Sequence, residues 1–74
     1  MYSRGRVGGY AFEVKLYKKR SKYGIDGGKI QKLSIYRNSD GAEVYFYDKG
    51  YRSSKEKMQG EFKEAYDQIL EWYN

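Results

Sequence analysis

A chain of 74 residues with a formal net charge of +5 and a mean hydropathy of −1.04 supports one small domain with a thin core. Because cysteine and histidine are absent, disulfides, thiolate or imidazole catalysis and the usual zinc sites are excluded. No apolar run approaches the roughly 20 residues of a membrane span, and the first residues lack the apolar stretch of a signal peptide, so we expect a soluble intracellular protein.

The first part of the chain predicts a hairpin and a loop. Residues 2–7 are short and mixed, and their pattern leaves open whether they join a sheet. A pair of glycines then favours a tight turn. Residues 10–17 alternate apolar and polar side chains, which is typical of a half-buried strand. After a basic run, residues 23–28 hold three glycines and predict a structured loop.

Two strands and a helix are expected in the remainder. A strand is predicted over about 29–37, with a bulge near Ile30 because this residue falls outside the alternation. The next segment, Asn-Ser-Asp-Gly, predicts a hairpin turn, and residues 42–48 a last strand. Ser53 and Glu56 have the spacing of a helix capping box. Apolar side chains then recur at helical spacing, although a glycine interrupts the start of that pattern.

Together these elements predict one α+β domain over residues 1–74. We expect an antiparallel three- or four-stranded β-meander covered on one face by a C-terminal helix, in the order ββββα. The inner face of the sheet is predicted to hold Tyr10, Phe12, Val14, Leu16, Leu33, Ile35, Val44 and Phe46. The helical stripe that covers it is predicted to be Met58, Phe62, Ala65, Tyr66, Ile69 and Tyr73.

The same alternation places tyrosines among lysines on the outer face, and 10 of the 74 residues are tyrosine. This face is predicted to carry Glu13, Lys15, Tyr17, Lys32, Ser34, Tyr36, Glu43, Tyr45 and Tyr47. We interpret it as a contact platform, in which rings stack on bases or fill pockets of a partner while lysines steer its approach. The alternative is that cross-strand pairs of these residues only stabilise a hydrated sheet face.

A basic run, Lys18, Lys19, Arg20 and Lys22, is the second candidate contact. Residues 1–37 carry ten basic and two acidic side chains, a balance of +8, whereas residues 38–74 carry five and eight, a balance of −3. This split predicts one electropositive end that attracts phosphates or an acidic protein surface. A solvated loop that keeps the neighbouring strand soluble is the competing interpretation.

Catalysis has little support in the sequence. Asp26, Asp40 and Asp48 lie in predicted turns, where aspartate is common because its side chain binds the backbone. The carboxylates of the helix are spread around it and do not predict the convergent cluster of a metal site. Residues 23–29 lack the glycine spacing of a Walker loop. We therefore expect no enzyme activity, no metal site and no cofactor.

Two segments, YGIDGGKIQKL at 23–33 and YDKGY at 47–51, resemble the signatures of a family of very short, uncharacterised proteins from Gram-positive bacteria and their phages. In that family Y-G-I-x-G-G-[RK]-I-x-K-L precedes Y-D-[RK]-G-[WY] and a C-terminal helix. The resemblance covers about residues 10–74 and implies a phage or mobile-element protein in the cytoplasm of a bacterial host. It supplies no activity, because the function of the family is unknown.

The resemblance has two departures and one structural implication. Tyr51 stands where tryptophan is more frequent, and the Lys18–Lys22 run is more basic than is usual, which implies a partner particular to this member. We interpret Gly24, Gly27 and Gly28 as a device of the fold, with Tyr51 packed against their loop.

The sequence thus predicts a non-enzymatic binding protein that engages, and inhibits, a bacterial host protein such as a CRISPR or other anti-phage nuclease. The target is expected to present an acidic or nucleic-acid-binding surface, and no membrane is involved. The predicted contact residues are Tyr17, Lys18, Lys19, Arg20, Lys22, Lys32, Tyr36, Tyr45 and Tyr47. Direct DNA or RNA binding through the same surface, and a homo-oligomer formed through an edge strand or the tyrosine face, remain open alternatives.

Overall fold

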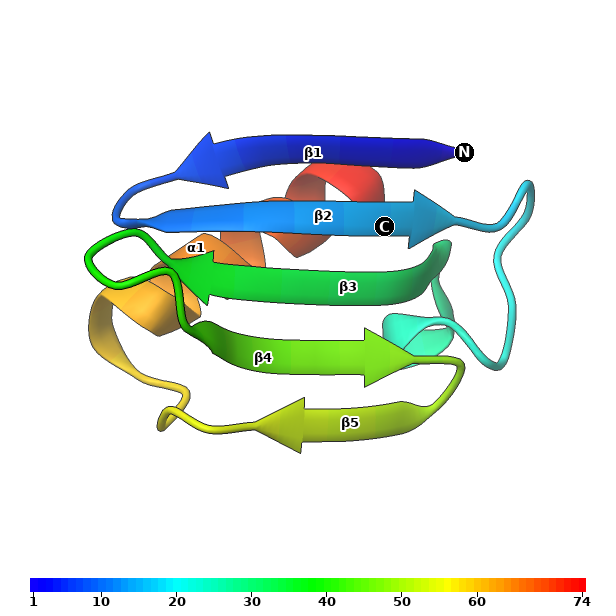
Figure 1. Ribbon diagram of the computed structural model, residues 1–74. Coiled ribbons are helices and arrows are strands. Elements are labelled where there is room, and N and C mark those ends of the chain that lie inside the picture. Colours follow the sequence, from blue (N-terminus) through cyan, green and yellow to red (C-terminus); the bar gives the residue numbers. More distant parts are fainter.

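The computed structural model describes residues 1–74 as an antiparallel sheet of five strands with one helix. Each strand pairs with its neighbour in sequence, so the sheet is a simple meander (Figure 1). The strands are β1 (Tyr2–Val7), β2 (Tyr10–Leu16), β3 (Ile30–Arg37), β4 (Glu43–Asp48) and β5 (Tyr51–Ser54). The predicted α+β meander is confirmed, but it has five strands and not three or four.

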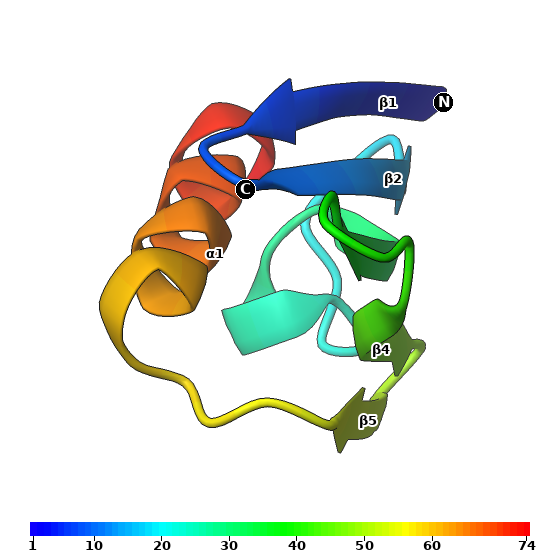
Figure 2. The same cartoon turned by 60° about the vertical axis from the view of Figure 1, so that its left-hand side comes forward.

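The helix α1 (Gly60–Tyr73) lies across one face of the sheet and leaves the other face open (Figure 2). Phe62, Ala65 and Ile69 are buried against the strands, and the rest of the predicted stripe is half-buried beside them. Tyr10 of β2 meets Phe62 with ring centres 5.6 Å apart. Burial of each large apolar side chain contributes roughly 1.5–3 kcal/mol, and a lone sheet would have no such layer.

The expected orientation of β4 is wrong. Tyr45 and Tyr47 lie opposite Ile35 and Leu33 in the register with β3, so they point toward the helix and are only 1% and 5% exposed. Phe46, which was expected in the core, lies on the open face. The cause is a bulge between Ile35 and Tyr36, which adds one residue to β4 and shifts every later side chain to the opposite face.

Other local features are confirmed. The Gly8–Gly9 turn joins β1 to β2, and residues 2–7 do form a strand. The register also shifts where Leu16 of β2 meets Ile30, which agrees with the bulge expected near Ile30. This irregularity lets Ile30 enter the core, where it is fully buried.

The segment before the helix differs from the prediction. Lys49 and Gly50 both have positive φ, 49° and 101°, and form a two-residue turn that returns the chain as β5. Ser53 therefore lies in β5 and caps no helix, and α1 begins only at Gly60 without a side-chain cap. The predicted capping box is wrong because local turn chemistry favours a fifth strand at this position.

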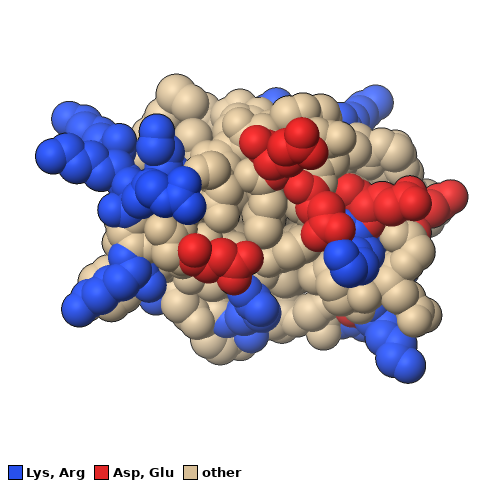
Figure 3. All heavy atoms as spheres, turned by 180° about the vertical axis from the view of Figure 1, so that it is seen from behind, with Lys and Arg blue, Asp and Glu red and all other residues tan.

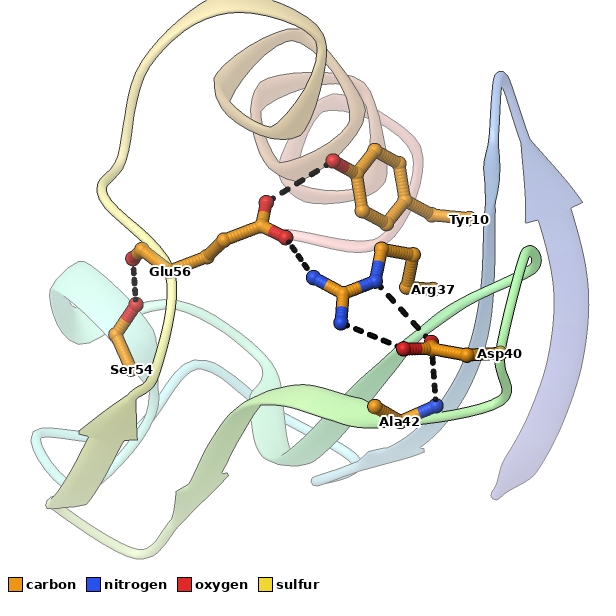
Figure 4. Close-up of polar contacts among 6 residues, drawn as sticks. All are labelled: Tyr10, Arg37, Asp40, Ala42, Ser54 and Glu56. Atoms are coloured by element: carbon orange, nitrogen blue, oxygen red, sulfur yellow. Dashed lines mark hydrogen bonds and ion pairs between the residues drawn. The ribbon is translucent and has the colours of Figure 1, made fainter.

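Glu56 ties the connector between β5 and α1 to the sheet (Figure 4). Its carboxylate accepts hydrogen bonds from the hydroxyl of Tyr10, at 3.1 Å, and from Arg37, at 2.6 Å. Arg37 also forms a two-pronged ion pair with Asp40, at 3.1 and 2.7 Å, and Asp40 accepts the N–H of Ala42. One arginine thus joins the β3–β4 turn to the connector.

Asn74, the C-cap residue of α1, closes the glycine-rich loop at 23–28. The Asn74 side chain donates to the carbonyl of Ile25, at 2.9 Å, and accepts the N–H of Ile30, at 3.2 Å. A Cβ at Gly28 would clash with this side chain, and a Cβ at Gly24 would clash with the backbone of Gly28. The interpretation of these glycines as a device of the fold is supported by these close approaches.

Tyr51 does not take the expected place against this loop. Its ring lies on the open face beside Phe46, with ring centres 6.2 Å apart. The tyrosine that holds the loop is Tyr47, whose hydroxyl donates to the carbonyl of Tyr23 at 2.7 Å. Ile25, in the short 3-10 turn of the loop, inserts into the core and is fully buried.

Candidate binding surface

The open face of the sheet differs in membership from the predicted one. The pairing of the strands places the following side chains on it: Tyr2, Arg4, Arg6, Ala11, Glu13, Lys15, Lys32, Ser34, Tyr36, Glu43, Phe46, Asp48, Tyr51 and Ser53. Lys32 and Tyr36 are where the alternation predicts them. Tyr45 and Tyr47 are absent from this face because they lie under the helix, so their expected contact with a partner is a prediction that the structure corrects.

Phe46 and Tyr51 replace the two buried tyrosines as the aromatic part of this face. Tyr51 is 65% exposed, and the ammonium group of Lys32 lies 5.8 Å from the centre of the Phe46 ring. An ammonium group over a ring is attracted to the negative charge of its π face. The result is a cation on β3, a ring on β4 and a second ring on β5, each beside the next. Recognition of β5 together with the bulge in β4 would have revealed this cluster in the sequence, because Tyr51 pairs with Asp48 and the bulge turns Phe46 to the open face.

A shallow hollow of 320 Å³ lies over β1, β2 and β3. Ala11 forms its floor because it stands between Arg6 and Tyr36 in the register and has the smallest side chain of the three. Glu13 accepts a hydrogen bond from the Tyr36 hydroxyl at 3.2 Å and lies 3.5 Å from Arg4. Burial raises the pKa of Tyr36, and the bond to Glu13 raises it further. This phenol therefore keeps its proton and donates a hydrogen bond to the carboxylate.

The basic run lies at one end of the molecule and is exposed. Lys18, Lys19, Arg20 and Lys22 follow β2 in the connection to β3, and none of them takes part in an ion pair. Figure 3 shows lysine and arginine gathered at the end of the molecule where Figure 1 draws this connection, with acidic side chains over the helix side. The expected electropositive end is therefore present.

Two residues of this loop have roles that the sequence does not indicate. Arg20 donates to the backbone carbonyl of Asn74 at 3.1 Å, so it also holds the loop against the end of the helix. Tyr23, which is 54% exposed, lies 5.2 Å from the ammonium group of Lys22 and adds an aromatic ring to the basic end. Tyr17 is half-buried, and it lines a hollow of 310 Å³ with Met1 and Lys18 between the loop and the start of β1.

The helix side carries the opposite charge. A hollow of 540 Å³ opens between the Gly8–Gly9 turn and α1, and Glu61 and Glu64 line it. No three or more acidic side chains converge to hold a metal ion. The 14 residues of α1 are too few and too polar to span a bilayer. The exposed tyrosines Tyr2, Tyr23 and Tyr51 and the basic run thus lie on the open face and its loop, away from these two glutamates.

A family model for a domain of unknown function, DUF7678, matches residues 1–74. The chain belongs to this family. No curated protein and no solved structure matches it. The expected membership in an uncharacterised family is confirmed.

Proposed function

We propose that this DUF7678 protein is a non-enzymatic binding protein that attaches to an acidic surface of a bacterial host protein and blocks it. In this proposal it acts in the host cytoplasm as a phage or mobile-element product, and a defence nuclease is the expected type of target. One observation carries the proposal: the helix covers only one face of the sheet, and the uncovered face presents exposed rings beside cations.

The size and shape of this face suit a macromolecule. The Cα atoms extend over 33 × 20 Å in the two longest directions. A face of this order, with the adjoining loop, is comparable to the roughly 800 Å² per partner of a standard protein interface. Its hollows are shallow and open, and exposed tyrosines supply wide contact at a low entropy cost.

The charges on the face favour a protein over a nucleic acid. Glu13 lies near the middle of the face, and Glu43 and Asp48 lie at the two ends of β4, so a phosphate backbone laid across the sheet would meet carboxylates. A protein surface can match such a mixture of signs residue by residue. Direct nucleic-acid binding stays the second candidate because Lys22 and Tyr23 combine a cation with an exposed ring at the basic end.

Two variants with the same change in charge test the role of the loop. Lys18→Ser with Lys19→Ser removes two cations beside the open face, whereas Lys55→Ser with Lys57→Ser removes two exposed cations from the connector. Arg20 is left in place because it contacts Asn74. We expect the loop variant to lose roughly tenfold or more in affinity for the target and the connector variant to lose little.

The target is obtained by capture from host lysate, with and without nuclease treatment, and the binding is repeated with the purified partner. Tight, saturable binding to one purified protein supports the proposal. A shift of random DNA whose log K falls steeply with log salt would support the nucleic-acid alternative instead. Equal affinity of the two variants would remove the loop from the binding surface.

A further inference from the structure

The two edges of the sheet are unequal. β5 has four residues and is followed directly by the connector to the helix, whereas β1 has six, and no strand lies beyond it in Figure 1. Short edge strands and covered edges are common protections against unwanted pairing. β1 has neither protection, and it contains no proline and no bulge.

The hydrogen-bonding groups on this edge follow from the pairing with β2. Met1 and Leu16 exchange two backbone hydrogen bonds, at 2.8 and 3.3 Å. Because such pairs alternate along an antiparallel ladder, Ser3, Gly5 and Val7 also face β2. Tyr2, Arg4 and Arg6 then turn their N–H and C=O groups away from the sheet. These three residues also carry their side chains on the open face.

The two faces beside this edge differ in chemistry. On the open face, Arg4 is 76% exposed with one ion pair of 3.5 Å, and Arg6 takes part in none. On the helix side, a Cβ at Gly5 would lie 2.9 Å from the Phe12 ring, so that ring extends beneath Gly5. The ring centres of Trp72 and Phe12 are 6.2 Å apart, and Trp72 is 54% exposed. The end of α1 reaches the level of β1 in Figure 2.

We propose that β1 takes up an added strand from the partner protein, with carboxylates on its open-face side and apolar side chains on its helix side. Residues directly opposite in a sheet share a face and have Cβ atoms about 5 Å apart, so acidic residues of the partner would lie beside Arg4 and Arg6. Its apolar residues would cover Trp72. This proposal rests on the proposed function only in taking the partner to be a protein.

A second copy of this chain is a poor occupant of the same edge. Antiparallel pairing of two β1 strands would place the arginines of one copy opposite those of the other. Like charges directly opposite each other destabilise a strand pair. Arg4 and Arg6 therefore disfavour self-pairing and favour an acidic strand.

The test uses labelled peptides of about nine residues, which is enough to span six residues at ~3.3 Å each. One peptide alternates glutamate and valine. A second has the same composition with its glutamates and valines in separate blocks, and a third alternates lysine and valine. Trp72 is the only tryptophan, so its emission reports contact on the helix side of the edge. We expect the first peptide to bind at least about tenfold more tightly than the others and to shift this emission to the blue.

Proline substitutions separate the strand contacts from charge. Arg4→Pro with Arg6→Pro removes two outward N–H groups and leaves the ladder to β2 intact, as edge strands tolerate. Arg4→Thr with Arg6→Thr removes the same charges and keeps the N–H groups. We expect the proline variant to bind the glutamate–valine peptide about tenfold more weakly than the threonine variant, since two hydrogen bonds are lost.

Equal binding by the two variants, equal binding of the block peptide, or no binding of any peptide would overturn the proposal. If the proline variant fails to fold, amide exchange on the unaltered protein decides. Added peptide must then protect the amides of Tyr2, Arg4 and Arg6. Should peptide binding fail while capture of a host protein still depends on Lys18 and Lys19, only the strand-addition proposal is lost.

Discussion

Two buried tyrosines of β4 differ in what their hydroxyl groups bind. The Tyr47 hydroxyl donates to the carbonyl of Tyr23, whereas the Tyr45 hydroxyl is buried without a hydrogen-bond partner. A buried polar group without a partner costs free energy, and a satisfied one contributes about 1 kcal/mol. Tyr47→Phe should therefore lower the free energy of unfolding by about 1 kcal/mol, and Tyr45→Phe should leave it unchanged or raise it. Urea denaturation checks both variants, and the opposite order would contradict the assignment.

The contact between Gly28 and Asn74 can be tested by a double-mutant cycle. Gly28 has a φ of −96°, so an alanine there meets no backbone strain, and the clash with the Asn74 side chain is the obstacle. Asn74→Ala removes the acceptor of the Ile30 N–H and one of the two donors to the carbonyl of Ile25, the other being the N–H of Gly28, and should cost roughly 1–3 kcal/mol.

In the Asn74→Ala background, Gly28→Ala should cost less than it does in the unaltered chain, because the side chain that it clashes with is gone. Unfolding free energies of the two single variants and the double variant measure this coupling. Strict additivity would mean that the two residues do not meet.

At the scale of elements, Glu56 determines how the connector lies. Its side chain is 28% exposed, and its carboxylate binds both Arg37 and Tyr10. Glu56→Gln keeps an acceptor for Tyr10 but removes the charge that binds Arg37, and should cost about 1 kcal/mol in the free energy of unfolding. Glu64→Gln, an exposed residue of α1 outside every ion pair, is the matched control. Faster amide exchange over residues 55–59 should accompany only the first substitution.

The elements also show where sequence patterns suffice. Alternation from Tyr10 to Leu16 has one apolar face, and it predicts β2 and the α+β meander correctly. From Val44 to Tyr47 all four side chains are apolar or aromatic, so alternation gives no direction there. The bulge between Ile35 and Tyr36 determines which side chains of β4 face the helix, and it places Tyr45 and Tyr47 in the core.

The two edge strands are not predicted by apolar–polar alternation, for another reason. β1 and β5 each bury little, because one side of an edge strand faces solvent, and no apolar stripe marks them. The basic run and Tyr36 of the candidate surface follow from local sequence. Phe46 and Tyr51 do not, because the place of Phe46 depends on the bulge in β4 and that of Tyr51 on the turn at Lys49 and Gly50.

For the whole molecule, titration predicts a broad plateau of stability. The chain has no histidine, so little changes between about pH 5 and 9. Burial is the main cause that raises the pKa values of Tyr10, Tyr36, Tyr45 and Tyr66 above 10. The folded protein then holds protons that the unfolded chain releases, so the free energy of unfolding should fall as the pH rises above about 10.

The acid side follows the opposite sign. Arg37 lowers the pKa of Asp40 from 3.8 to about 2. The stability that this pair provides is complete above about pH 4 and is lost as the pH falls toward 2. Urea midpoints across the pH range measure both limbs. Asp40→Asn should flatten the acid limb and Tyr45→Phe the alkaline one, and a transition near pH 6–7 would contradict this account.

The meander has a kinetic consequence. Every strand pairs with the one next to it along the chain, so each hairpin closes a short segment, and only the β2–β3 connection is longer. Chains with such low contact order cross their folding barrier quickly, in about milliseconds for mixed folds of this size. The sheet can form one hairpin after another. The contacts of α1 and Asn74, which join distant segments, then stabilise it. Until that last step Tyr45 and Tyr47 face water. The partly folded sheet is therefore most prone to aggregate with other copies of the chain at this stage.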